Sequence, residues 1–282
     1  DADPGFVDPA PADRARELLT RAYDESQPVV AALGGHVIKT GCGPYLIDWM
    51  ERGLLHGLAL NGAAAIHDAE LALVGKTSED VSASLNEGTF GMARETADVF
   101  AVASRTGAQD ELGLGAALGV ILEKLDCRYP AQSVLLAAHR LGIPLTVHVA
   151  LGADIVHMHP HVSGGAVGES SHLDFRRVCT MLTKMQKGIW MNLGSAVMMP
   201  EVLLKAVSVV RNFGHSLDGF VTINVDKSVQ YRSAVNVLDR PSAEGLQLTG
   251  HHEVLLPLLH AALSRHLAEH PKNHEETVRL AA

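Results

Sequence analysis

Histidine is abundant in this chain, at 16 of 282 residues. Those whose neighbours suggest chemistry are His148, His157, His159, His161, His251 and His252. His157, His159 and His161 alternate, so on a β-strand they would point to one face. Neutral imidazoles bind zinc and similar ions, and they transfer protons near neutral pH. These histidines are therefore expected to line a pocket.

The spacing of the histidines matches no established zinc motif, because the HExxH and Cys/His patterns are absent. We therefore expect hydrogen-bonded pocket histidines and assign no metal ligand. A divalent metal bound by His157, His159 and either His251 or His252 stays open as an alternative.

Four side chains are candidates for catalysis. His148, His157 and Glu253 are candidate general acids or bases. Lys39 follows an apolar run and is expected to point into the pocket as a cationic anchor, although most lysines lie on the surface.

Turns of small residues are expected after three short apolar strands, each leading into a helix. The first turn ends the run Gly35-His-Val-Ile-Lys-Thr-Gly41. The second opens the run Asn61-Gly-Ala-Ala-Ala-Ile-His-Asp68, and the third is Gly194-Ser195. Small residues let backbone N–H groups and a helix N-terminus approach a phosphate. The candidate cofactor-binding residues are Thr40, Gly41, Asn61, Gly62, Ala63, Asp68, Gly194 and Ser195. For Asp68, a purely structural role near the start of a helix is equally open.

Strand and helix patterns alternate through most of the chain. Strands are expected at 35–41, 55–60, 143–149, 189–193 and 220–224, with helices between them and a polar, irregular stretch at 225–250. This alternation predicts an α/β fold, a doubly wound and mostly parallel sheet with helices on both faces. The expected organisation is an arm and helix at 1–29, one α/β domain at 30–270 with a helical insertion at about 76–130, and an exposed tail at 271–282.

Composition narrows the function classes. Hydrophobic residues make up 47% and aromatic residues 4%, as expected for helices packed closely on a parallel sheet. A net charge of −9 argues against nucleic-acid binding. The sequence contains no run of about 18 apolar residues, so no membrane span is predicted. The three cysteines are widely spaced and form no CxxC pair, so a reducing, cytoplasmic setting is expected.

The order of the motifs over about residues 30–265 resembles the deoxyhypusine synthase family. The matching segments are the first two small-residue runs above, Ile143-Pro-Leu, 150–158, 193–197, Thr222-Ile-Asn-Val-Asp226 and Leu255-Leu-Pro-Leu-Leu. The resemblance implies a doubly wound NAD-binding fold in a homotetramer. It also implies a reaction in which NAD takes a hydride from spermidine and an aminobutyl group passes through a lysine imine to a translation factor. It adds Asp154, Asn224 and Asp226 to the candidate cofactor-binding residues.

The chain departs from that family at its active site. The family's catalytic lysine lies in a Trp-Gly-Lys sequence before the last helix, and here 228–250 contains neither lysine nor tryptophan. Without that amine the imine route lacks its nucleophile. Where the family has Lys-His-His, this chain has Met198-Met-Pro200. Where the family has an acidic cofactor contact, this chain has His67, and the family's Asp-Ala before the last helix is His251-His252 here.

The expected function is that of an NAD-linked transferase or oxidoreductase acting on an amine or another small polar substrate. Its ligand is expected to be a small, polyamine-like molecule, and its assembly a homo-oligomer. A metal-dependent enzyme and a non-catalytic, ligand-binding paralogue are the alternatives.

Overall fold

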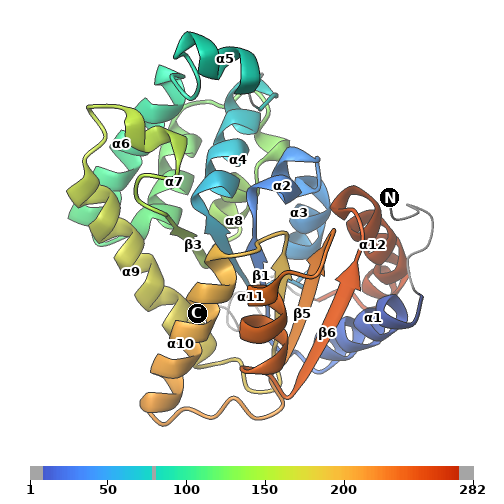
Figure 1. Cartoon of the computed structure of the whole chain (residues 1–282). Coiled ribbons are helices and arrows are strands. Elements are labelled where there is room, and N and C mark those ends of the chain that lie inside the picture. Colours follow the sequence, from blue (N-terminus) through green and yellow to red (C-terminus); the bar gives the residue numbers. More distant parts are fainter. Residues whose placement is uncertain (1–8, 78–80, 273–282) are drawn as a thin grey trace.

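A parallel β-sheet of six strands lies at the centre of the computed structural model, which describes residues 9–77 and 81–272 (Figure 1). The strands are β1 (Val29–Leu33), β2 (Gly57–Asn61), β3 (Leu145–His148), β4 (Ile189–Leu193), β5 (Val221–Asp226) and β6 (Glu244–Thr249). Their order is β3-β2-β1-β4-β5-β6, and every neighbouring pair is parallel. This is the order of doubly wound nucleotide-binding folds, so the predicted fold class is confirmed.

Helices cover both faces of the sheet (Figure 1). They are α1 (Pro9–Asp24), α2 (Gly35–Lys39), α3 (Gly43–Glu51), α4 (Gly62–Val74), α5 (Val81–Glu87), α6 (Arg94–Gln109), α7 (Gly113–Lys124), α8 (Val134–Arg140), α9 (Gly164–Leu182), α10 (Met198–Asn212), α11 (Tyr231–Ser233) and α12 (His252–Glu269). Two 3-10 helices, η1 (Pro130–Gln132) and η2 (Ile155–Met158), and a π-helix, η3 (Ala234–Asp239), complete the helical elements of the described residues.

The side chains of β1 alternate between two hydrophobic cores. Val29, Ala31 and Leu33 pack with α1, α3, α4 and α12, whereas Val30 and Ala32 pack with α9 and α10. A strand that is buried on both faces has a nearly continuous apolar sequence. This explains why β1 and β4, at the centre of the sheet, contain almost only apolar residues.

The prediction of a strand over 35–41 is wrong, because most of that run is the helix α2. His36 and Lys39 are exposed while Val37 and Ile38 are buried, which is a helical pattern. The first strand is the apolar run immediately upstream, Val29–Leu33, which pairs with both β2 and β4. The glycines after Leu33 therefore end the first strand instead of introducing it.

The stretch 225–250 was predicted to be irregular, and the structure contradicts this. It contains η3 and the strand β6. β6 pairs with β5 along its whole length, with Glu244 opposite Val221 at one end and Thr249 opposite Asp226 at the other. β6 is an edge strand, and of its residues only Leu248 is buried. The weak apolar pattern of an edge strand explains why the sequence did not reveal it.

Between 76 and 130 the described residues form α5, α6 and α7 and no strand. α6 and α7 pack against each other and against α9, and α7 also contacts β3. No helix in the described part of the chain is both long and apolar enough to cross a membrane.

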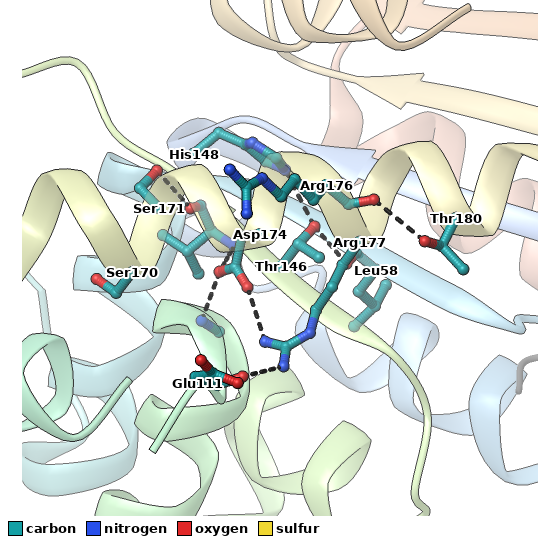
Figure 2. A network of polar contacts seen from close by, with 12 residues as sticks. Leu58, Glu111, Thr146, His148, Ser170, Ser171, Asp174, Arg176, Arg177 and Thr180 are labelled. Atoms are coloured by element: carbon teal, nitrogen blue, oxygen red, sulfur yellow. Dashed lines mark hydrogen bonds and ion pairs between the residues drawn. The ribbon is translucent and has the colours of Figure 1, made fainter. Parts of the chain in front are cut away.

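Asp174 on α9 joins three of these elements (Figure 2). Its Oδ2 accepts the N–H of Gly115 at 2.7 Å and that of Val147 at 2.8 Å. Arg177 lies 3.5 Å from its other oxygen and donates to the carbonyl of Glu111 at 2.6 Å. Burial raises the pKa of Asp174 to about 7. A single carboxyl group thus ties α9 to the start of α7 and to β3.

Candidate functional site

The direction in which strands are added reverses between β1 and β4, and doubly wound folds bind ligands at the carboxyl ends of the strands at this point. Gly34 donates its N–H to the carbonyl of Leu193 at 2.8 Å, and Gly194 donates to that of Val225 at 2.9 Å. A Cβ atom added to Gly34 would lie 1.9 Å from the carbonyl oxygen of Gly194. The two turns therefore meet backbone to backbone, and position 34 has room only for glycine.

The turn after β1 also touches the start of α4. A Cβ atom added to Gly35 would lie 3.0 Å from the Cβ of Ala63. Asn61 ends β2 and caps α4, because its Oδ1 accepts the N–H of Ala64 at 2.8 Å. The turns after β1 and β2 are therefore adjacent at one edge of the sheet, whereas the predicted first turn at Thr40-Gly41 follows α2 instead.

The N-terminus of α4 faces a carboxylate from a distant segment. A Cβ atom added to Gly62 would lie 2.1 Å from Oδ2 of Asp154. The same oxygen accepts the N–H of Ala150 at 3.2 Å. Burial raises the pKa of Asp154, while the positive end of the α4 dipole favours the charged form. The structure thus brings together three predicted cofactor-binding residues, Asn61, Gly62 and Asp154.

A buried amide network joins β4, β5 and β6 to the turn after β4. Asn192 Nδ2 donates to Asn224 Oδ1 at 2.6 Å and to the carbonyl of Ser195 at 2.9 Å. Asn224 donates in turn to Gln247 Oε1 at 2.8 Å. The hydroxyl of Ser195 accepts the N–H of Met199 at 3.1 Å, close to the start of α10. These bonds fix the shape of the turn at Gly194-Ser195.

The carboxylate of Asp68 is engaged inside the protein. It is fully buried and accepts the hydroxyl of Ser133 at 2.5 Å and the N–H groups of Val134 and Leu135 at 2.8 and 3.1 Å. Burial raises its pKa to about 6. Both of its oxygens thus bind the start of α8.

The prediction that three alternating histidines share one strand face is wrong. They lie on η2 and the loop after it; the rings of His159 and His161 meet edge to face with centroids 5.7 Å apart, but the polar contacts of the three lead to different segments. The contacts are His157 Nδ1 with Gly152 N at 3.3 Å, His159 Nε2 with Gly91 O at 3.0 Å, and His161 Nε2 with Asp98 Oδ1 at 2.8 Å. Among the described residues these three histidines form no candidate metal-ligand group.

The remaining predicted residues are dispersed. His148 ends β3 and is buried with its Nε2 3.0 Å from Thr146 Oγ1; burial lowers its pKa to about 4, so its ring is neutral at pH 7. The others lie near the ends of elements: exposed Lys39 in the last turn of α2, Thr40 at its C-cap, exposed Gly41 after it, and half-buried Asp226 at the end of β5.

The structure gathers a group of titratable side chains near the Gly194 turn, and two of its members, His252 and Glu253, are candidates from the sequence. His36 comes from the first turn of α2, and His252 and Glu253 open α12. One ring nitrogen of each histidine and one carboxylate oxygen lie within 4.8 Å of one another. His36 was missed in the sequence because the first strand was placed over it. A strand at 29–33 would have put His36 directly after the strand end.

No family model matches this sequence, and neither does any curated protein. Its fold resembles a protein of Methanococcus maripaludis S2 named as a conserved LOR/SDH protein, with TM-score 0.59 and 17% identity over 93% of this chain and 70% of that one. It also resembles AgrE in its ternary complex with ornithine and NAD+, with TM-score 0.59 and 17% identity over 90% of this chain.

This chain covers only 32% of the length of AgrE. A protein of Entamoeba histolytica named as a deoxyhypusine synthase matches with TM-score 0.54 and 10% identity, over 90% of this chain and 87% of that one. At these identities the likeness extends to the fold alone. This chain thus shares the doubly wound α/β fold of these proteins.

Proposed function

We propose that this chain binds NAD across the carboxyl ends of β1 and β4 and uses it on a small polar substrate. The observation that supports this most is the contact between the Gly34 and Gly194 turns where the strand order reverses. Because Gly34 and Gly194 carry no side chain, the backbones of the two turns meet at the point where doubly wound folds bind a dinucleotide. When bound, NAD would accept or supply a hydride.

The position of Asp154 supports a binding site for the adenosine half of NAD. In doubly wound folds an acidic residue near the end of the second strand binds the ribose hydroxyls. Here that strand ends in Asn61, whose side-chain oxygen caps α4. Asp154 reaches the same place from the loop after β3 and contacts Gly62. Its carboxylate would therefore hold the ribose and favour NAD over a 2′-phosphorylated dinucleotide.

An amine is the substrate class that we propose first. The resemblance to deoxyhypusine synthases implies spermidine, and AgrE was crystallised with ornithine, which also carries amino groups. Two lysines that follow the carboxyl ends of strands, Lys39 after β1 and Lys227 after β5, are exposed. We therefore propose hydride transfer without a lysine imine.

The test is calorimetric titration of the chelator-treated chain with NAD and NADP. The wild type should bind NAD more tightly than NADP. The substitution Asp154→Asn keeps an oxygen for the N–H of Ala150 but removes the charge, so NAD affinity should fall roughly tenfold or more. Asp110→Asn, an exposed aspartate at the end of α6, is the matched control and should bind like the wild type.

A wild-type chain that binds no NAD at millimolar concentrations would refute the proposal. Equal NAD affinity in the Asp154→Asn variant would refute the ribose contact. NAD binding with no NADH formed from a panel of amines would favour the non-catalytic alternative.

A further inference from the structure

His252 has one ring nitrogen that is satisfied and one that is not. Its Nε2 lies 3.1 Å from the carbonyl oxygen of Val225. A carbonyl can only accept, so Nε2 carries the proton and Nδ1 keeps a lone pair. Nδ1 is buried and has no hydrogen-bond partner among the described residues. Buried polar atoms nearly always have a partner, so this lone pair indicates that a group is missing.

His36 and Glu253 lie where such a group would bind. The rings of His36 and His252 meet edge to face, with centroids 5.7 Å apart and an interplanar angle of 65°. The carboxylate of Glu253 completes a set of three ligand atoms within 4.8 Å of one another. Ligands of a tetrahedral zinc ion lie about 3.4 Å apart. His36 and Glu253 are exposed, so their side chains are free to rotate toward that separation.

We propose that His36, His252 and Glu253 bind a divalent metal ion of the zinc type. Two imidazoles and one carboxylate form a donor set typical of catalytic zinc sites, and three protein ligands leave a position for water or substrate. Zinc-bound histidines usually donate their other N–H to a carbonyl or carboxylate, as His252 does to Val225. This proposal goes beyond the dinucleotide site and does not depend on it.

The surroundings of the three ligands fit an open metal site. His251 Nδ1 lies 3.4 Å from Glu253 Oε1 and can orient that carboxylate. A Cβ atom added to Gly194 would lie 2.9 Å from His252 Nε2, so His252 packs against the turn after β4. The metal would therefore stand at the carboxyl ends of the strands, with its open position available to water or to a small ligand.

The experiment titrates the full, metal-stripped chain with Zn²⁺ in competition with a chromophoric chelator. The wild type should bind about one equivalent, and Co²⁺ should give a visible band of four- or five-coordinate geometry. His36→Ala and Glu253→Gln change exposed side chains outside the core, and each should weaken Zn²⁺ binding by at least about tenfold. The matched control is His215→Ala, an exposed histidine after α10.

Zinc binding below about a tenth of an equivalent would overturn the proposal. So would wild-type affinity in both ligand variants, or an equal loss of affinity in His215→Ala. A double variant, His157→Ala with His159→Ala, tests whether these other histidines contribute to Zn²⁺ binding. It should bind Zn²⁺ like the wild type. Because these titrations contain no NAD, their outcome is independent of the dinucleotide proposal.

Discussion

Two aspartates inside this chain, Asp68 and Asp174, use their carboxyl groups to hold the starts of neighbouring elements. Asp174 accepts two backbone N–H groups on one oxygen, and Asp68 binds the first turn of α8. Burial raises the pKa of Asp174 to about 7 and that of Asp68 to about 6, from an ordinary value of 3.8. In the unfolded chain both groups would ionise near that ordinary value.

Stability should therefore depend on pH through these residues. Between about pH 4 and pH 7 the folded state holds more protons than the unfolded state. The stabilising contribution is present below that window and is lost as the pH rises through the folded pKa values.

The substitution Asp174→Asn tests this dependence. One amide oxygen can accept both N–H groups that Asp174 Oδ2 accepts, but the amide does not titrate. The contribution of Asp174 to the free energy of unfolding falls as the pH rises, so the variant measured in urea should gain stability relative to the wild type between about pH 4 and pH 7. The control Asp110→Asn should keep the wild-type slope, and an unchanged slope in Asp174→Asn would contradict the assignment.

At the scale of elements, the strand–turn–helix units decide where the site lies. The sequence predicted strands followed by turns of small residues, and this holds after β2 and β4. It misplaced the first unit because a fully buried strand such as Val29–Leu33 is only a short apolar run, which periodicity cannot distinguish from part of a helix. Pairing with β2 and β4, which is not local in sequence, identifies that run as a strand.

Gly34 is the position in these units least tolerant of substitution. Gly34→Ala would place a methyl group 1.9 Å from a backbone oxygen, and the two central strands would have to separate. We expect a loss of at least about 2 kcal/mol in the free energy of unfolding. Gly164→Ala is the control, because position 164 opens α9 and has no atom within 4 Å. The control should lie within about 1 kcal/mol of the wild type by urea denaturation, and equal stability of the two variants would contradict the close contact.

At the scale of the whole molecule, a large cavity lies far from the proposed site. A cavity of about 450 Å³ is lined by residues of α7, α8 and α9 and by the residues that lead into β3, among them Leu145, Arg177 and Lys184. It opens at the amino end of β3, whereas the Gly34 and Gly194 turns lie at the carboxyl ends of the strands. Cavity size alone would therefore point away from the proposed site, to the opposite end of the strands.

Assembly is also a property of this scale. The homotetramer implied by the resemblance to deoxyhypusine synthases stays a prediction, and sedimentation equilibrium at micromolar concentration measures it. We expect a mass near four times the 30.0 kDa of the chain. A mass of one chain, unchanged on tenfold concentration, would contradict it.

The sequence by itself determined the doubly wound fold class and the turns at Asn61 and Gly194, because alternating apolar segments and small residues are local signals. Tertiary structure alone decided which side chains meet. Asp154 reaches Gly62 from the loop after β3, and His36 meets His252 across more than two hundred residues of chain. Both encounters depend on the order of strands in the sheet, since that order places the carboxyl ends of distant strands side by side. The spacing of histidines along the chain carried no such information, because the group at 157–161 lies on a short helical turn and the loop after it, and its polar contacts lead to three different segments.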